Sequence, residues 1–341
     1  MSSTILGIDL GTMNMKISSR AGNKILCEKN VIAIEDDRRL YAFGDDAYEM
    51  YEKAPDNIKV SFPIKGGVIA DFKNMQDILL AFLNENFANQ LKGSTVIIAV
   101  PTDITEVEKR AYYDLVDGLH LKLSSIMVCD KPIAVAIGLG LPVTTATGMM
   151  IIDIGADTTE ISVLSLGGIV ISKLIKMGGN KMADAIIAAI KRDKELEIGR
   201  RSAENILSEL GFAKDPEDMT KKVVGRNVRT GFPVSEEISS LEVYDAIKDF
   251  FDQIVDSVKF ILERTPPELT SDIIDNGMYL SGGVSNIRNI DTLLSEETEL
   301  DVNKGENPIV NVAMGLEKIA AKPSLAQLAT AMGVSKGRGR R

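Results

Sequence analysis

The stretch Ile151-Ile-Asp-Ile-Gly-Ala-Asp-Thr-Thr-Glu-Ile-Ser-Val163 joins two apolar runs through an acid, a glycine and a pair of threonines. The chain opens in the same way, with Ile5-Leu-Gly-Ile-Asp-Leu-Gly-Thr-Met-Asn-Met-Lys-Ile17. Apolar runs of this length on either side of a glycine turn are typical of a β-hairpin. The acids Asp9 and Asp153 lie near the end of the first run in each stretch. The two stretches therefore predict a protein built from two similar halves.

A similar order of elements follows each hairpin. Residues 95–100 and 278–281 are expected to form further strands, and residues 76–87 and 244–264 carry apolar side chains at helical spacing. We therefore predict an α/β fold of two similar halves, each with a mixed sheet and helices, and a cleft between the halves.

Local patterns outside the hairpins predict two further helices. Thr105-Glu-Val-Glu108 has the threonine and glutamate spacing of a capping box, and Val107, Ala111 and Leu115 follow at helical spacing. The uncharged stretch 132–152 is long enough to cross a membrane, but glycines, a proline and threonines interrupt it. We expect this stretch to form a buried helix, a turn and a buried strand.

Composition narrows the class of protein. Of the 341 residues, 45% are apolar, which is enough for sizeable cores, and the net charge of −10 disfavours nucleic-acid binding. Cys27 and Cys129 are the only cysteines, and we expect both to be buried thiols in a reducing cytosol.

The N-terminus lacks the pattern of a signal peptide. The basic end at 336–341 is interpreted either as a solvated tail or as a contact for anionic lipid or a partner.

The two glycine turns have the chemistry of a phosphate site. Glycine lets the backbone approach a ligand closely, successive N–H groups in such a turn form a concave anion site, and Thr12 and Thr158 add hydroxyl donors. Asp9 and Asp153 supply the hard oxygen ligands that Mg²⁺ prefers. One such turn alone usually only reverses the chain. Two turns, with Ser281-Gly-Gly283 as a third, predict a clamp for a polyphosphate, although the sequence has no P-loop motif.

Many further segments match one family. They are Gly44-Asp-Asp-Ala47, Gly66-Gly-Val-Ile-Ala-Asp-Phe72, Val100-Pro101 with Ile104-Thr-Glu-Val-Glu-Lys-Arg110, Ala136-Ile-Gly-Leu-Gly-Leu-Pro-Val143, Leu164-Ser-Leu-Gly-Gly-Ile169, Gly178-Gly-Asn-Lys-Met182, Thr230-Gly-Phe-Pro233, Thr265-Pro-Pro-Glu-Leu269 and Leu294-Ser-Glu-Glu-Thr298. Together with the turns, they resemble the actin/Hsp70/sugar-kinase superfamily and, within it, the MreB family of bacterial actins. The resemblance runs from about Gly7 to Ile319.

This resemblance implies an actin-like fold that binds ATP and Mg²⁺ in the cleft and polymerises head to tail into cytoskeletal filaments for cell shape or motility. Its candidate partners are further copies of the chain, other actin-like paralogues and, weakly, the anionic inner face of the cell membrane, from a cytoplasmic location. The implied domains are 1–145 with a small insert at about 31–70, 146–305 with a small insert at about 181–246, a helix at 306–325 that returns to the first domain, and a basic tail at 326–341.

The resemblance also assigns residues to the nucleotide. They are Thr12, Met13, Asn14 and Lys16 in the first turn, Gly155, Ala156, Asp157 and Thr158 in the second, Glu204 and Asn205 at the ribose or base, and Gly282, Gly283 and Val284 at the adenosine. For Met13, Asn205 and Val284 the alternative is that they only shape the wall. For Lys16 the alternative is a lysine that faces solvent from a strand.

Two departures from the family pattern concern catalysis. Lys131 stands where the family has the glutamate that orients the attacking water, and Asp157 stands where the family has glycine. A lysine stays protonated unless it is strongly desolvated, so it is a poor base. We therefore expect weak ATPase activity, and we interpret Lys131 and Asp157 as an ion pair that cancels both charges. The alternative is that Lys131 extends into solvent and Asp157 only tolerates a turn conformation. If hydrolysis is fast, another residue such as Asp130 or Thr158 positions the water.

A sugar or acetate kinase of the same superfamily is the alternative function. Such a phosphotransferase needs a second substrate pocket and a base near the terminal phosphate, and the sequence offers no motif for either. A chaperone ATPase would need a peptide-binding domain for which the length leaves no room.

Overall fold

The computed structural model describes residues 4–20 and 24–331. Contacts within the chain divide it into unit 1, Met1–Leu141 with Val312–Arg341, and unit 2, Pro142–Asn311. The expected domain boundaries at 145/146 and 305/306 lie a few residues away and stay predictions. The basic end at 336–341 lies outside the described residues.

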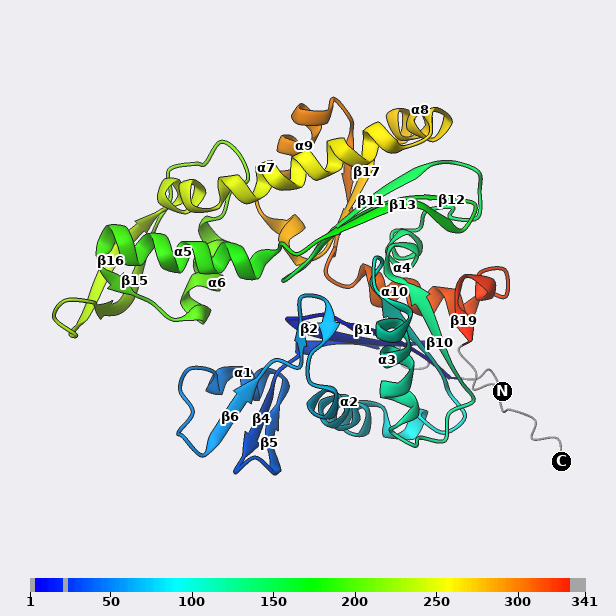
Figure 1. The fold of residues 1–341 in the computed structure, drawn as a ribbon, viewed down its shortest axis with the longest axis horizontal. Coiled ribbons are helices and arrows are strands. Elements are labelled where there is room, and N and C mark those ends of the chain that lie inside the picture. The colour runs from blue at the N-terminus through cyan, green and yellow to red at the C-terminus, as the bar shows by residue number, and fades with distance from the viewer. Residues whose placement is uncertain (1–3, 21–23, 332–341) are drawn as a thin grey trace. The chain divides into compact units, whose positions relative to one another are not determined.

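The main sheet of unit 1 has the strand order β19-β10-β9-β1-β2-β3 (Figure 1). Its strands are β1 (Ile5–Leu10), β2 (Asn14–Ser19), β3 (Lys24–Lys29), β9 (Thr95–Val100), β10 (Ser125–Asp130) and β19 (Thr330–Ala331). The first three form an antiparallel meander, and β9 and β10 continue the sheet in parallel from β1. The predicted first hairpin and the predicted strand at 95–100 are confirmed.

The main sheet of unit 2 repeats this plan in the order β13-β12-β11-β17-β18. Its strands are β11 (Met149–Ile154), β12 (Thr159–Ser165), β13 (Gly168–Ile175), β17 (Met278–Ser281) and β18 (Val302–Lys304). Again three strands form an antiparallel meander, and two strands continue in parallel from the first. Because β1 and β11 hold the same place in the two sheets, their turns are equivalent.

The core of unit 1 lies between its main sheet and two helices. The helices of this unit are α1 (Gly44–Met50), α2 (Phe72–Phe87), α3 (Glu106–Asp117), α4 (Lys131–Gly138) and, after its first residue, α10 (Asn311–Ala321). Apolar side chains of β1, β2 and β9 pack with those of α2 and α3, which lie side by side (Figure 1). On the other face of the sheet, Ser18 Oγ donates a hydrogen bond to the backbone oxygen of Ala313 at 2.7 Å, so α10 is held against β2.

Smaller elements complete unit 1. A second sheet has the order β5-β4-β6, and a short hairpin joins β7 to β8. Their bounds are β4 (Ile32–Glu35), β5 (Arg39–Phe43), β6 (Ile58–Ser61), β7 (Ile64–Lys65) and β8 (Val68–Ile69).

Unit 2 covers its main sheet with a second set of helices. They are α5 (Gly179–Lys194), α6 (Arg200–Leu210), α7 (Ser240–Arg264), α8 (Pro267–Asn276) and α9 (Ile290–Thr298). A small sheet of β14 (Leu196–Glu197), β15 (Thr220–Asn227) and β16 (Pro233–Ser239) completes the unit. Its core joins apolar side chains of β11 and β12 with those of α5, α6 and α7.

The predicted capping box is present, but the apolar spacing after it does not mark the buried face of α3. Thr105 and Glu108 bond each other's backbone N–H groups. Val107, however, is 80% exposed. The buried side chains are Tyr112, Tyr113, Leu115 and Val116. The spacing of aliphatic residues missed this face because two tyrosines supply much of the contact.

The remaining expectations about burial are met in part. The stretch 132–152 forms the body of α4, a loop and β11, as expected. Within residues 4–20 and 24–331, no helix is long and apolar enough to cross a membrane. Cys129 is buried, but Cys27 is exposed, so the expectation of a buried thiol is wrong for Cys27. The physical reason is that β3 is an edge strand of its sheet.

Candidate functional site

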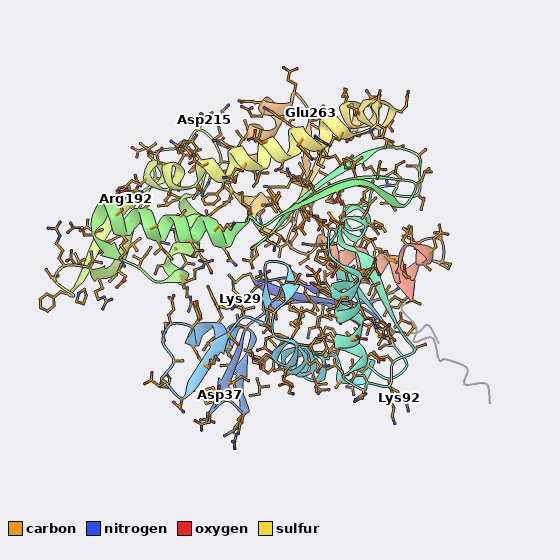
Figure 2. All side chains as sticks on the ribbon, in the orientation of Figure 1. Lys29, Asp37, Lys92, Arg192, Asp215 and Glu263 are labelled. Carbon is orange, nitrogen blue, oxygen red and sulfur yellow. The ribbon has the colours of Figure 1, made fainter. Side chains whose placement is uncertain are left out.

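The first turn, Gly11–Met13, is held from one side by an asparagine. Asn30, which follows Lys29 at the end of β3 (Figure 2), is fully buried. Its Nδ2 donates to the backbone oxygen of Gly11 at 2.9 Å, and its backbone N–H donates to that of Met13 at 2.9 Å. In a trans peptide the C=O and the next N–H point in opposite directions. The N–H of Thr12 is therefore directed away from Asn30.

The second turn, Gly155–Thr158, is held in the same way by the start of α5. Gly179 N–H donates to the oxygen of Gly155 at 3.1 Å, and Asn180 N–H donates to that of Ala156 at 2.7 Å. Both carbonyls thus face the helix, so the N–H groups of Ala156 and Asp157 face away from it. Two adjacent N–H groups on one side of a turn form an anion site.

Close approach around the second turn depends on glycine. A β-carbon at Gly178 would lie 2.5 Å from the backbone oxygens of both Gly155 and Ala156. A β-carbon at Gly282, whose φ is +86°, would overlap the backbone of Ile154. Gly283 has no atom within 4 Å of the position of a β-carbon, so this residue borders open space. The second turn and the glycine turn after β17 therefore come together within unit 2, and their assignment to phosphate and adenosine stays a prediction.

The acid of the first hairpin already has a cationic partner. Asp9 is 4% exposed, and Lys16, directly opposite it on β2, places Nζ 2.9 Å from Asp9 Oδ2. The alternative in which Lys16 faces solvent from its strand is therefore wrong, and its assignment to the nucleotide stays a prediction. Cys27 lies opposite Lys16 on β3. Desolvation raises the pKa of the Cys27 thiol, and the Lys16 ammonium partly offsets this rise.

The acid of the second hairpin faces another acid. Asp153 is directly opposite Glu160 on β12, and both residues are 3% exposed. Side chains opposite each other in an antiparallel pair lie on the same face, with β-carbons about 4.5–5.5 Å apart. On its other side Asp153 is paired with Ser281 of β17. Buried carboxylates at this separation favour a cation between or beside them.

Other residues assigned by resemblance lie on helices. Lys131 is the first residue of α4 and is partly buried, and Asp130 before it forms an ion pair with Lys109 at 3.3 Å. Glu204 on α6 accepts a hydrogen bond from Arg200 Nε at 3.2 Å, while the neighbouring Asn205 is exposed. These pairings fix Asp130 and Glu204 in place without assigning them a ligand.

The remaining residues divide between wall and turn. Met13 packs against the small apolar cluster beside β4 and α1, and Val284 is buried and lies 3.1 Å from the position of a β-carbon at Gly179. Both placements fit the alternative in which these side chains only shape a wall. Asn14 begins β2, and Thr158 immediately precedes β12.

Three residues of the site were missed from the sequence. Asn30 and Asn180 support the two turns, and Glu160 lies beside Asp153. Asparagine is common in loops and at helix starts, so its type carries little signal. The only sequence signal for Asn180 is its position directly after the glycine pair at 178–179.

Comparison with known proteins gives a consistent family match. A family model described as MreB/Mbl protein matches residues 3–327. The cell shape-determining protein MreB of Escherichia coli (strain K12) is 38% identical over 323 residues, 92% of each chain. The cell shape-determining protein Mbl of Bacillus subtilis (strain 168) is 37% identical over 316 residues, which are 91% of this chain and 93% of that protein.

Solved structures show the same fold. The crystal structure of MreB5 of Spiroplasma citri bound to AMPPNP superposes with a TM-score of 0.87 at 30% identity, over 94% of this chain and 96% of that chain. The MamK double helical filament structure has a TM-score of 0.80 at 22% identity, over 94% and 99% of the two chains, and so supports the fold alone. The predicted actin-like fold is confirmed.

Proposed function

The chain belongs to the MreB/Mbl family of bacterial actins, and on this premise we propose that it binds ATP and polymerises. The observation that carries the proposal is the pair of equivalent turns. The carbonyls of the first turn are bonded to Asn30, those of the second to Gly179 and Asn180, and the N–H groups that follow these carbonyls are directed away from these partners. Such turns bind the phosphates of one nucleotide if the two units hold that nucleotide jointly. The MreB5 structures bound to AMPPNP and ADP support the class of ligand.

The adenosine side of the site is proposed in unit 2. Gly282 requires its positive φ, and Gly283 borders open space, so a flat base has room to approach this backbone. Glu204 is the candidate for a ribose or base contact. Asn205 is exposed on the same helix and is retained as a candidate for the wall.

Two acidic residues face each other on the central hairpin of unit 2. Asp153 and Glu160 are opposed and buried, and Asp9 in unit 1 forms an ion pair with Lys16. We therefore propose Asp153 as the main metal-binding acid and Asp9 as an outer group that orients solvent. When bound, Mg²⁺ would neutralise charge on the phosphates.

Polymerisation is proposed from the family and from symmetry. A head-to-tail contact between identical asymmetric chains produces an open filament when the rotation between neighbours does not close a ring. Nucleotide favours assembly if it shifts the chain toward one arrangement of its units. We expect sedimentation of the purified chain with Mg·ATP, at concentrations up to tens of micromolar, the range of weak protein contacts. Absence of sedimentation together with transfer of phosphate to a sugar or acetate would favour the kinase alternative.

Hydrolysis is proposed to be slow because Lys131 stands at the start of α4, where the family has a glutamate. Positioning of a base or water contributes about 10²–10⁴-fold to a rate. At saturating ATP, Lys131→Glu with Asp157→Gly should therefore release phosphate much faster than the wild type in a single turnover. Lys131→Glu alone should recover less, because Asp157 then still stands in the second turn where the family has glycine. A wild-type rate equal to that of the double variant would contradict this proposal.

The cytoplasmic location and a weak membrane contact remain proposals. Basic residues near an anionic surface contribute about 1 kcal/mol each, and the end at 336–341 supplies several. We expect co-sedimentation with anionic liposomes that is weak and is lost at high salt or on removal of these residues. Strong, salt-insensitive binding by the truncated chain would contradict it.

A further inference from the structure

The second turn contains a carboxylate, Asp157, although its backbone has the geometry of an anion site. The structure directs this carboxylate toward α5. Asn180 Nδ2 donates to Asp157 Oδ1 at 2.6 Å, from the same side on which Asn180 N–H bonds the oxygen of Ala156. The N–H of Asp157 points away from that side. The bonded carboxylate oxygen and the anion-binding N–H of one residue therefore face in opposite directions.

The start of α5 provides a favourable place for this charge. Its N-cap, Gly178, has no side chain to cap the helix, and the first turn of the helix contains no acid. The last turn carries Lys191, Arg192 and Lys194 (Arg192 is labelled in Figure 2), which complement the negative end of the helix dipole. A carboxylate at the N-terminal end complements the positive end. Asp157 supplies that charge from the neighbouring turn.

Asn180 fixes the turn at two points. Its N–H orients the peptide between Ala156 and Asp157, and its side-chain amide holds the carboxylate of Asp157. Rotation of that peptide would break the first bond and turn the Asp157 N–H toward the helix. The hydrogen bond between the Asn180 amide and the Asp157 carboxylate opposes this rotation, and a hydrogen bond to a charged group is stronger than one between neutral groups.

We propose that Asp157 and Asn180 form a positioning pair that keeps the N–H groups of the second turn directed at the nucleotide phosphates. Asp157 is thus a positioning residue and not a catalytic one. The pair turns a carboxylate that would repel phosphate into a support for the phosphate turn. This inference rests on the proposed nucleotide binding and assigns to that site two side chains that act without touching the ligand.

A matched pair elsewhere separates positioning from ordinary helix capping. At the start of α2, Asp71 accepts hydrogen bonds from Asn74 N–H at 3.0 Å and from Asn74 Nδ2 at 2.7 Å. This second aspartate and asparagine pair also stabilises a helix start, but it lies in unit 1 and contains no residue of the second turn or of α5. Its variants report what the loss of a capping pair does by itself.

The test is calorimetric titration of the full chain with a non-hydrolysable ATP analogue and Mg²⁺. Asp157→Ala and Asn180→Ala should each weaken binding about tenfold, and the double variant should be no weaker than the worse single variant. Asn180→Asp should be the weakest because it opposes two carboxylates. Combining Asp157→Asn with Asn180→Asp restores one donor and one acid and should recover most of the affinity.

The control variants Asp71→Ala and Asn74→Ala should lower the melting temperature without changing the affinity of the folded chain. Affinity that is unchanged in all position 157 and 180 variants, or a swapped pair as weak as Asn180→Asp, would overturn the inference while leaving nucleotide binding intact. A wild-type chain that binds no nucleotide would instead refute the proposed function on which the inference rests.

Discussion

The central hairpins of the two units share their strand order and register but treat their acids in opposite ways. In unit 1 the acid Asp9 faces Lys16, and their side chains form an ion pair at 2.9 Å. In unit 2 the equivalent acid, Asp153, faces Glu160 across the same position of the ladder. The first arrangement joins two opposite charges. The second places two buried carboxylates opposite each other, and it is the arrangement that we propose a bound cation would stabilise.

The turns of the same hairpins are held by similar backbone contacts but by different side-chain contacts. Each is held by an asparagine that donates through its backbone and its side chain, Asn30 in unit 1 and Asn180 in unit 2. The side chain of Asn30 bonds a backbone carbonyl, whereas that of Asn180 bonds the carboxylate of Asp157. In both units an asparagine N–H thus bonds a carbonyl of the turn, while the group bonded by the asparagine side chain differs between the units.

Loss of the cation in the first hairpin should be the most costly change. Lys16→Met leaves the buried carboxylate of Asp9 without its ammonium partner. Removing one partner of a buried ion pair lowers the free energy of unfolding by about 3–5 kcal/mol. Glu160→Gln keeps the shape of its side chain and relieves repulsion in the second hairpin, so its cost should be below about 1 kcal/mol. Urea unfolding without nucleotide measures both. Equal losses would remove the electrostatic difference between the hairpins.

The response to magnesium should differ between the two acids. Asp153→Asn should abolish most of the gain in nucleotide affinity that Mg²⁺ provides, at least about tenfold, whereas Asp9→Asn should retain the larger part. The ratio of affinities with Mg²⁺ and with a chelator reports this gain for each variant. The chelator values serve as the control, since they should change little. A larger loss in Asp9→Asn would reverse the proposed roles.

A smaller effect is expected at Cys27. Removal of the Lys16 ammonium takes away the charge that partly offsets desolvation, so the pKa of the Cys27 thiol should rise further in Lys16→Met. Because the thiolate is the reactive form, alkylation at pH 8 should slow by a few-fold, and its pH profile should move upward. Mass spectrometry of the peptide follows the rate, with the buried Cys129 as an internal reference. An unchanged or faster rate would show that Lys16 does not act on this thiol.

Much of the fold was predictable because its signals are local. Each hairpin has a glycine turn between apolar runs, the stretch at 132–152 has breakers that mark a turn, and the capping box at Thr105 marks the start of α3. The buried face of α3 was not predictable from aliphatic spacing, since Tyr112 and Tyr113 fill it. The exposure of Cys27 depends on which strand lies at the edge, and strand order is a property of the whole sheet.

The site was predictable at its turns but not at their supports. The residue types and spacing of Gly155 and Asp153 predict a phosphate-binding turn and a metal-binding acid. The bond from Asn180 to Asp157 and the opposition of Asp153 to Glu160 depend on the exact register and on where α5 begins. These contacts join residues whose types are common in loops and strands, so only the three-dimensional structure reveals them.

The central claim is that one nucleotide is held by both turns. Titration of a non-hydrolysable ATP analogue with Mg²⁺ into the wild type, Asn30→Ala and Asn180→Ala tests it directly. We predict one site per chain and a loss of about tenfold in each variant, because each variant would release one of the two turns that are proposed to bind phosphate. Two independent sites per chain, or a loss confined to one of the two variants, would contradict the claim.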